Sequence, residues 1–473
     1  MDIALIEALK AAVGSEVVLT DADSLAARNH DRWVVSHYRN WQAAEGKHAA
    51  LPNPGCVARP RSVADVQAIM RFASQHNMPV MPYGLGSGVC GGVIGDPSML
   101  LLDMSALNSL RYIDETNLLA SFDAGYNGMA AEEAVAAKGL TIGNWPQSIA
   151  ISSVGGWIST RASGQFSTAY GNIEDIIYTV EVVLPDGELV TLGKAPRAAA
   201  GPDLRHIIMG AEGTMGIVTG VTLSLRRLPE HRAYSAYYAD SMEQGFEAQR
   251  RIIHAEWRPP VMRQYDAPEV ARLFAPYVRD DKCLLIMVHE GPKARVEVEL
   301  AAVAAITAAA GLSTADTAAV EGWMAHRNNV PDWMDLFKMG VIADTIEVSG
   351  TWTQIGPIYR DVMAALSTVP NIANASAHSS HVYRSGINIY CTFACLPGDV
   401  AEMEARYFEC WDKVLEAVAA GGGGIAHHHG AGRLRKAYLH HDLGESGVAL
   451  LRRIKGAVDP QGIMNPGNLL PDA

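Results

Sequence analysis

The sequence predicts an α+β protein of two or more domains, and three observations carry this prediction. The chain has 473 residues, which is too many for one simple hydrophobic core. Residues 54–103 read in the order strand, helix, strand, loop, strand. After Pro229, helices alternate with strands, which is typical of a domain with an antiparallel sheet.

Composition narrows the classes of function. Hydrophobic residues make up 49% of the chain and charged residues 19%, an ordinary globular balance. A net charge of −13 without a basic run argues against a nucleic-acid partner. The six cysteines form no CxxC pair, so neither a disulfide framework nor a zinc ribbon is expected. With no signal peptide and no apolar run that could span a bilayer, we expect a cytoplasmic protein without an integral membrane segment.

The most informative stretch is a glycine-rich loop between two apolar runs. Five glycines fall within residues 84–92, after the run that begins at Pro79 and before the run that ends at Asp103. Glycines let backbone N–H groups approach an anion closely, most naturally a phosphate. Residues 86–91 match the dinucleotide-binding fingerprint literally, but Gly95 and Pro97 would break the helix which that motif requires. We therefore predict a strand–loop–strand phosphate cradle; the alternative is a flexible surface loop.

The first half of the chain contains further recognisable elements. Residues 1–50 look helical and could form a lid or an oligomer arm. Ser62 is predicted to cap a helix, with Asp65 completing a near capping box. Further on, we expect a strand over Tyr112–Gly125, a helix over Met129–Lys138, and strands over Ile176–Leu184, Glu188–Leu192 and Val221–Leu225.

Residues 145–175 have few charges and many hydroxyls and glycines. A solvated loop or a packed helix does not require this composition. A backbone segment that contacts a polar ligand does require it. A second turn rich in glycine and hydroxyl residues, 210–219, leads into a strand. Both segments are therefore candidates for ligand contact.

The second half is expected to hold helices over Val296–Ala310 and Ala401–Ala420 and strands over Leu284–His289 and Ile387–Ala394, with a closing helix near Val448–Val458. In the strand near residue 390, alternation places Asn388, Tyr390 and Thr392 on one face and apolar residues on the other. The polar face is the candidate pocket wall, although a tyrosine merely packed on a sheet is an equally good interpretation of Tyr390.

Three consecutive histidines, His427–His429, lie between glycines and close to Arg433 and Arg435. As a strand, His427 and His429 would share one face. A metal pair is one interpretation, but no third ligand stands at ordinary spacing. A structural histidine is the second, and a base beside a bound ligand is the third. His378 and His381 could likewise bind substrate or metal.

Together these residues resemble the FAD-linked oxidase family, the vanillyl-alcohol-oxidase or PCMH type of flavoprotein, and within it alkyl-dihydroxyacetone-phosphate synthase and its bacterial relatives. The motifs are residues 153–157 with 160–164, 170–175, 209–216 and 427–435, and the resemblance covers roughly residues 54–470. It implies a PCMH-type two-subdomain FAD-binding domain plus an α+β substrate (cap) domain with an antiparallel sheet. The implied boundaries are a helical extension at 1–50, the FAD domain at 51–230, the cap at 231–420, and a segment at 421–473 that returns to the FAD domain.

The resemblance also implies which residues hold the cofactor. Residues 82–88 would hold the FAD pyrophosphate, the serines would line the flavin or the phosphates, and residues 212–218 would meet the adenine end. Some family members attach FAD through a histidine beside the first glycine turn; Ser87 stands here, which implies non-covalent FAD. The implied cofactor residues are Pro82, Tyr83, Gly84, Leu85, Gly86, Ser87, Gly88, Gln147, Ser148, Ser152, Ser153, Gly156, Thr160, Ala162, Ser163, Gly164, Glu212, Gly213, Gly216, Ile217 and Val218.

For catalysis the resemblance implies Tyr390 as an acid/base residue, Arg263 and Arg327 facing the substrate, and His427, His428 and His429 beside the flavin, with no metal. Arginine suits a carboxylate or phosphate through its planar fork. The first hypothesis is hydride transfer from a small anionic hydroxy compound, such as a 2-hydroxy acid, to FAD. The second is alkyl transfer through a flavin adduct, and a third is a non-catalytic flavin-binding module. We expect a homodimer or another homo-oligomer, and the sequence leaves the electron acceptor unknown.

Overall fold

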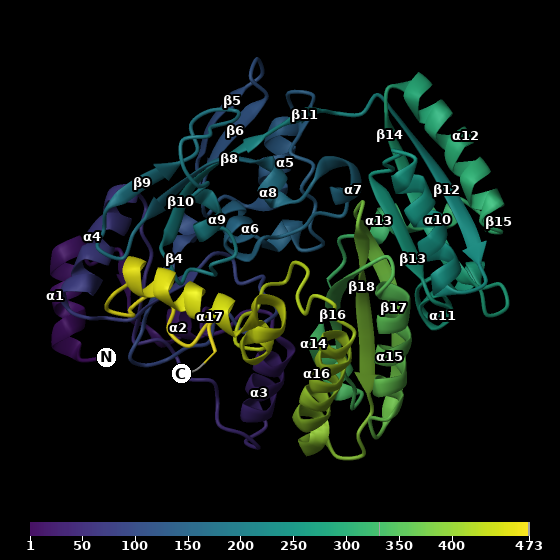
Figure 1. Ribbon diagram of the computed structural model, residues 1–473. Coiled ribbons are helices and arrows are strands. Elements are labelled where there is room, and N and C mark those ends of the chain that lie inside the picture. Colours follow the sequence, from purple (N-terminus) through teal and green to yellow (C-terminus); the bar gives the residue numbers. More distant parts are fainter. Residues whose placement is uncertain (331, 472–473) are drawn as a thin grey trace. The chain divides into compact units, whose positions relative to one another are not determined.

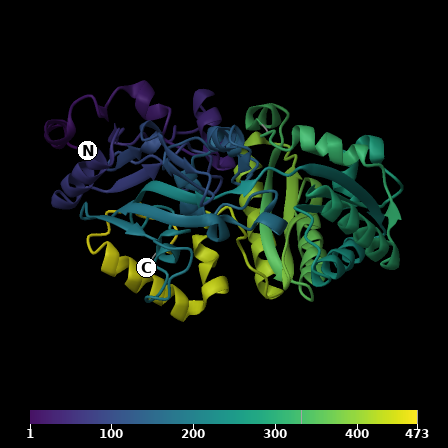
Figure 2. The ribbon, with the colours of Figure 1, turned by 90° about the horizontal axis from the view of Figure 1, so that it is seen from above.

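The computed structural model describes residues 1–330 and 332–471, which form two compact units (Figure 1). Unit 1 comprises residues 1–163, 172–227 and 428–473, and unit 2 comprises residues 164–171 and 228–427. The first described residues, drawn in purple in Figure 2, and the last described residues, drawn in yellow, both belong to unit 1. The mixture of helices with parallel and antiparallel strands confirms the predicted α+β class.

The first sheet of unit 1 carries the glycine loop. Its strand order is β1 (Val18–Leu19), β2 (Cys56–Ala58), β4 (Leu100–Asp103), β3 (Val80–Tyr83), and β4 runs parallel to both β2 and β3. Helix α4 (Val63–Gln75) connects β2 to β3, as a parallel crossover requires. Its predicted capping box between Ser62 and Asp65 is confirmed. The loop leaves β3 and returns in β4, with no helix between them, so the predicted strand–loop–strand order is correct.

The second sheet of unit 1 is antiparallel, in the order β5 (Leu110–Asp114), β6 (Leu119–Asp123), β10 (Ile217–Ser224), β8 (Ile177–Val183), β9 (Leu189–Leu192). The prediction of one strand over Tyr112–Gly125 is wrong, because this segment contains the end of β5, a hairpin turn and the whole of β6. Asp114 makes the turn: its Oδ1 accepts the backbone N–H groups of Thr116 and Asn117.

The other elements of unit 1 surround these sheets. The predicted helical N-terminus is confirmed except for β1, and the closing helix α17 begins before the predicted residue 448 and is interrupted at Gly444. These elements are α1 (Ile3–Val13), α2 (Ala22–Ala26), α3 (Val34–Ala44), α5 (Gly128–Ala136), β7 (Leu140–Thr141), α6 (Val154–Thr160), α8 (Ile173–Ile176), α9 (Arg205–Ile208), β11 (Arg226–Arg227) and α17 (Leu439–Val458).

Unit 2 is organised around one seven-stranded sheet whose neighbouring strands are all antiparallel, as predicted. The order is β15 (Ser313–Thr314), β12 (His231–Ala239), β14 (Cys283–Gly291), β13 (Val261–Tyr265), β17 (Ile372–Val382), β18 (Gly386–Cys395), β16 (Ile342–Thr351). The helices are α7 (Ser167–Tyr170), α10 (Met242–His254), α11 (Ala267–Leu273), α12 (Lys293–Ala309), α13 (Ala318–His326), α14 (Trp333–Lys338), α15 (Ile355–Ser367) and α16 (Met403–Ala420).

The predicted alternation of β18 is confirmed. Ile389, Cys391 and Phe393 are completely buried, and the Phe393 ring lies 5.8 Å from the ring of Tyr407 in α16. Helices α15 and α16 pack on this part of the sheet (Figure 1). Because side chains alternate along a strand, Tyr390 and Thr392 project from the opposite face. That face carries the polar side chains described below.

Two general features complete the fold. Within residues 1–330 and 332–471, none of the helices combines the length and the apolar character needed to cross a bilayer. All six cysteines are buried free thiols, and the sequence predicts no disulfide framework.

Candidate active site

The glycine loop of unit 1 presents a row of backbone donors. Among the described residues, no protein acceptor receives a hydrogen bond from the backbone N–H groups of residues 85–89. Gly86 has φ +69°, and a Cβ there would lie 2.5 Å from the hydroxyl oxygen of Tyr83. A loop of this kind can bind an anion through its backbone N–H groups, without a charged side chain of its own. These residues therefore fit the pyrophosphate of a dinucleotide cofactor such as FAD.

The N-terminal extension holds one side of this loop. Arg32 N–H donates to the Gly88 carbonyl oxygen at 2.8 Å, and Gly95 N–H donates to the Asn29 carbonyl at 2.7 Å. Between them, the carboxylate of Asp31 accepts the N–H groups of Trp33 (3.0 Å) and Val93 (3.4 Å). Burial raises the pKa of Asp31 to about 7, although these N–H donors lower it. Residues 29–33 thus fix the loop, a role that the sequence did not indicate.

The segment that follows the histidine run, residues 430–435, holds the other side of the loop; we call it the stem. The N–H of Arg433 donates to the Cys90 carbonyl at 3.0 Å. Gly432 has φ +56°, and a Cβ there would lie 2.2 Å from that same carbonyl oxygen. The stem can therefore approach the loop this closely only because residue 432 is a glycine.

Glu212 fastens the stem in place. Its carboxylate accepts the backbone N–H groups of Ala431 (2.7 Å) and Gly432 (3.0 Å) and the side-chain amide of Asn468 (3.1 Å). Burial raises the pKa of Glu212, which the N–H donors partly oppose. The resemblance implies that residues 212–218 meet the adenine end of FAD; the structure shows in addition that the Glu212 side chain binds the stem.

The serine-rich segment meets the loop at the beginning of α6. A Cβ at Gly84 would lie 2.6 Å from Ser153 Oγ, so loop and serine are in close contact. Ser153 also caps α6 by accepting the N–H of Gly156 at 3.2 Å. Ser152 accepts the indole N–H of Trp157 at 2.9 Å, and Thr160 donates to the Gly156 carbonyl.

The remaining predicted cofactor residues divide between the units. Gly213 packs against the Pro82 ring, and Ile217 and Val218 begin β10. Gly164 belongs to the short segment 164–171 of unit 2. The others lie in unit 1: Gln147, Ser148, Ala162, Ser163 and Gly216.

In unit 2, Arg263 and Tyr390 come together on one face of the large sheet. Arg263 of β13 donates from Nη1 to Ser380 Oγ at 2.6 Å and from Nε to the Tyr265 hydroxyl at 2.9 Å. Its guanidinium carbon lies 6.0 Å from the centre of the Tyr390 ring and 5.3 Å from that of Trp323. An arginine whose fork is fixed in this way is suited to binding an anion.

Tyr390 lies at the centre of a chain of polar groups. Its hydroxyl lies 3.3 Å from His381 Nε2, and His381 Nδ1 lies 2.6 Å from Ser167 Oγ. On its other side, the Tyr390 ring stacks on His378 with 4.5 Å between centroids. Burial raises the pKa of Tyr390, so the phenol stays protonated at neutral pH and acts as a hydrogen-bond donor.

A bulge in β17 aims His381 toward this cluster. The pairing of β17 with β18 shifts between Ser379 and Val382. Asn388 Oδ1 accepts the backbone N–H groups of Ser380 (3.2 Å) and His381 (2.8 Å). Because a bulge inserts an extra residue, it turns side chains that would otherwise alternate. Asn388 therefore maintains the bulge from within the sheet.

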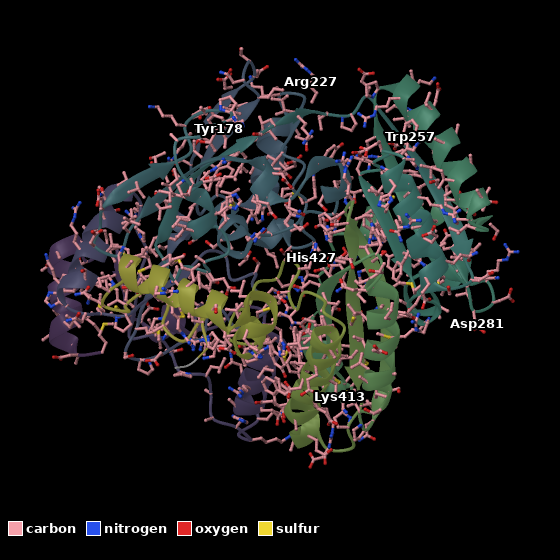
Figure 3. All side chains as sticks on the ribbon, viewed as in Figure 1. Tyr178, Arg227, Trp257, Asp281, Lys413 and His427 are labelled. Carbon is pink, nitrogen blue, oxygen red and sulfur yellow. The ribbon has the colours of Figure 1, made fainter. Side chains whose placement is uncertain are left out.

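The three histidines of the run do not form a strand, so the interpretation in which His427 and His429 share a strand face is wrong. Residues 427–429 are bends between glycine hinges. His427, labelled in Figure 3, belongs to unit 2, where its Nε2 lies 2.6 Å from the Tyr383 hydroxyl and its ring stacks on His381 at 4.9 Å. His428 and His429 belong to unit 1, and their rings meet edge to face at 4.4 Å.

Arg327 stands just past the end of α13, one turn after Trp323. Its guanidinium lies 5.9 Å from the Phe166 ring, and its backbone carbonyl accepts a hydrogen bond from Gln165 at 2.9 Å. Burial and the neighbouring Arg232 lower the pKa of Arg327. Tyr170 and Arg232 both bind Glu290 nearby. Arg327 is thus associated with segment 164–171.

Several residues of these clusters have no signal in the sequence. Ser167, Ser380 and Glu269 are common residue types at unremarkable spacing, and each meets its partner more than 100 positions away. Asp31 is likewise 62 positions from Val93. An alignment of related sequences is the kind of signal that could have singled them out.

Two family descriptions match this chain. Residues 54–193 match "FAD binding domain", and residues 228–469 match "FAD linked oxidases, C-terminal domain". Together they cover most of the chain, and the second begins close to the change of pattern near residue 229.

Related proteins match along nearly the same extent. The uncharacterized FAD-linked oxidoreductase YgcU of Escherichia coli (strain K12) is 33% identical over 99% of this chain and 98% of its own length. Alkyldihydroxyacetonephosphate synthase of Trypanosoma brucei brucei is 29% identical over 88% of this chain and 73% of its own. Glycolate oxidase subunit GlcD of Bacillus subtilis (strain 168) is 27% identical over 88% and 89%.

Solved structures show the same fold. An alkyldihydroxyacetonephosphate synthase has a TM-score of 0.79 at 22% identity, covering 98% of this chain and 85% of its own. Substrate-bound p-cresol methylhydroxylase has a TM-score of 0.74 at 16% identity, covering 99% and 96%. These likenesses confirm the predicted PCMH-type architecture.

Proposed function

The chain belongs to the FAD-linked oxidase family of FAD-dependent oxidoreductases, and from this premise we propose that it oxidises a small anionic hydroxy compound such as a 2-hydroxy acid. The observation that carries the proposal is the Arg263–Tyr390 cluster of unit 2. A fixed guanidinium for a carboxylate lies beside a protonated phenol and several imidazoles. Such a face can hold an anion, orient a hydroxyl group and accept its proton.

The assignment of roles follows from the chemistry of each group. When bound, FAD supplies the two-electron acceptor, at its N5 position, for the hydride of the substrate carbon. Arg263 binds the substrate anion, with Arg327 as the second predicted cation. Tyr390 donates a hydrogen bond to the substrate oxygen, and an imidazole accepts the hydroxyl proton. The similarity to a glycolate oxidase subunit supports a 2-hydroxy acid.

Anaerobic reduction tests this proposal. The purified protein is mixed with a panel of 2-hydroxy acids, simple alcohols and phosphate esters, and bleaching of the flavin absorbance is followed. We expect at least one hydroxy acid to bleach the flavin in a single turnover. If only uncharged alcohols do so, the proposed role of Arg263 is wrong. An unbleached flavin with every compound would contradict the oxidase proposal.

A second candidate is alkyl transfer without net oxidation, favoured by the 29% identity to the synthase from Trypanosoma brucei brucei. In that reaction an incoming alcohol would replace an acyl group, which would leave as its carboxylate, and bound FAD would supply a transient adduct without net oxidation. The two candidates differ in the final state of the flavin. Product formation with the flavin oxidised at the end of the reaction, and no need for an electron acceptor, would identify the transferase.

We also propose that FAD is bound non-covalently, because Ser87 occupies the position where a linking histidine would stand. Acid precipitation should release all of the yellow colour into the supernatant, whereas a yellow pellet would contradict the proposal. Six free thiols without a disulfide support a reducing cytoplasm as the location. A homodimer is proposed from the family resemblance alone, and light scattering during gel filtration tests it.

A further inference from the structure

His378 and Glu269 form a buried pair that the assignments above do not use. His378 Nδ1 lies 3.2 Å from Glu269 Oε1, and the two residues are 9% and 1% exposed. Glu269 belongs to α11 and reaches His378 on β17, while Arg272, one turn further along α11, binds the same carboxylate oxygen at 2.8 Å. A carboxylate fixed in this manner selects the tautomer of its histidine, because it accepts the Nδ1 proton.

The second nitrogen of His378 is open. Within residues 1–330 and 332–471 no group forms a hydrogen bond with His378 Nε2. The imidazole is neutral, since burial lowers the pKa of His378 even though Glu269 raises it. With its proton held at Nδ1, the neutral ring keeps a lone pair on Nε2. Nε2 can therefore accept a proton.

The ring stands among the residues proposed to bind substrate. It is stacked between Tyr265 at 5.2 Å and Tyr390 at 4.5 Å, and Tyr390 is its direct partner across the two strands. The Arg263 guanidinium lies over both tyrosine rings, at 5.7 Å and 6.0 Å. A substrate anion held by Arg263 would thus lie on the face that carries His378.

The other candidate bases on this face are less suited. Tyr390 stays protonated and can donate but not accept a proton at neutral pH. His381 already uses both ring nitrogens, one with Ser167 and one with Tyr390. His427 Nε2 is engaged by Tyr383. Of His378, His381 and His427, His378 is the one whose Nε2 has no hydrogen-bond partner within residues 1–330 and 332–471.

We propose that His378 is the base that takes the substrate hydroxyl proton and that Glu269 is its positioning residue, an inference that rests on the proposed oxidation. The O–H proton moves to Nε2, the C–H electron pair leaves with its hydrogen to FAD as the two-electron oxidant, and the C=O bond forms. Glu269 then stabilises the imidazolium through its hydrogen bond to Nδ1.

The chain offers a matched control for this proposal. His289 and Glu299 form a second buried histidine–glutamate pair in unit 2, with Nδ1 2.8 Å from Oε1. There, however, Nε2 is occupied by Ser235 Oγ at 2.9 Å, and His289 is completely buried. The two pairs share the contact between a histidine Nδ1 and a glutamate Oε1, and Nε2 is available in His378 but occupied in His289. A purely structural effect of removing an imidazole should therefore appear in both.

The first measurement needs no substrate. The ¹⁵N chemical shifts of histidine-labelled protein, assigned by comparison with His378→Asn, report the tautomer of His378. We expect the Nδ1–H form in the parent protein, and in Glu269→Gln either the Nε2–H form or a mixture, because a glutamine amide can donate to Nδ1. Glu269→Asp should retain the Nδ1–H form. An Nε2–H tautomer in the parent protein would overturn the proposal regardless of which compounds the enzyme oxidises.

The second measurement is the rate of anaerobic flavin reduction per bound FAD. His378→Asn keeps a donor for Glu269 but removes Nε2, and we expect it to be slower by a factor of ~10² to 10⁴. The parent rate should fall at acidic pH as Nε2 becomes protonated. The titratable and charged groups that face the ring are Glu269, Arg272, Arg263, Tyr265 and Tyr390. The acidic decrease in rate should be absent in His378→Asn. His289→Asn should keep the parent rate.

These outcomes separate the two proposals. If a hydroxy acid reduces the parent flavin and His378→Asn is reduced equally fast, His378 is not the base, while the proposed function stands. If no hydroxy acid reduces the parent flavin, the proposed function fails, and the role of His378 as its base fails with it. Equal loss of rate in His378→Asn and His289→Asn would show a structural effect and would also overturn the proposal.

Discussion

The glycine loop of unit 1 and the polar face of β17 and β18 in unit 2 offer different kinds of groups to a ligand. The loop offers backbone N–H groups, and the side chains around it, such as Asp31 and Glu212, hold the backbone in position. The polar face offers side chains, and it is the backbone pairing of the strands that holds them in position. Substitutions in the loop should therefore act on the fold of the cradle, whereas substitutions on the sheet face should have graded effects on a ligand.

The largest expected effect is the loss of FAD binding on substitution of Gly86. Gly86→Val should abolish FAD binding, with a loss of affinity beyond a thousandfold, since φ is +69° and the new Cβ would collide with Tyr83. Gly139→Val is the matched control: its φ is +70°, but nothing lies within 4 Å of the new Cβ. Fluorescence titration of the apoproteins with FAD measures both. Normal FAD occupancy in Gly86→Val would show that the loop does not hold the phosphates.

Asp31 should make the stability of the cradle depend on pH. Its pKa of about 7 in the folded protein exceeds the 3.8 of a free side chain, so its contribution to stability is complete below pH 4 and is lost as the pH rises through 7. Between pH 5 and pH 8, the free energy of unfolding of the parent protein should fall by roughly 3 kcal/mol relative to Asp31→Asn, about a hundredfold in the unfolding constant.

Urea unfolding at several pH values measures this difference. Asp23→Asn serves as the control, because Asp23 is exposed and its variant should follow the parent at every pH. The unfolding free energy of the parent minus that of Asp31→Asn must fall as the pH rises. A constant difference across the range would mean that Asp31 is already charged at pH 5 and that burial does not dominate its titration.

Glu212 tests whether the stem depends on a carboxylate. Glu212→Gln keeps one acceptor oxygen but turns an amide N–H₂ toward backbone N–H groups, so at least one of the bonds to Ala431, Gly432 and Asn468 is lost. We expect a loss of about 2 kcal/mol, or roughly thirtyfold in the unfolding constant. Urea unfolding compares this variant with Glu133→Gln, which alters an exposed glutamate of α5. Equal stability of the two variants would contradict the fastening role of Glu212.

The two regions also differ in how much of them the sequence could predict. The loop was predictable because strand, glycines and strand are contiguous, and Ser62 and Asp65 mark the crossover helix within four residues. The alternation of β18 was predictable for the same local reason. The hairpin at Asp114 was missed because its turn contains neither glycine nor proline, and the histidine run was misread because the glycine hinges prevent strand formation.

What the sequence could not predict are contacts between distant segments. Nothing near Glu269 indicates that it will contact His378, because the two residues are 109 positions apart in the sequence. The same holds for Asp31 with Val93 and for Glu212 with the stem. In each case a carboxylate is fully or partly withdrawn from water, which is unfavourable unless its partners are in place. The sequence shows the carboxylate but not its burial.

The smallest expected effect lies on the polar face, at Arg263. Arg263→Lys keeps the charge but loses the fork that binds Ser380 and Tyr265 together. With the hydroxy acid that best reduces the flavin, KM should rise about tenfold while kcat changes little, because an anion bound equally in the ground and transition states contributes to KM alone. Arg279→Lys is the control, since Arg279 lies over the Tyr238 ring at 5.4 Å, away from the cluster. Steady-state kinetics decide the matter: a fall in kcat at constant KM would mean that Arg263 acts on the transition state instead of holding the substrate.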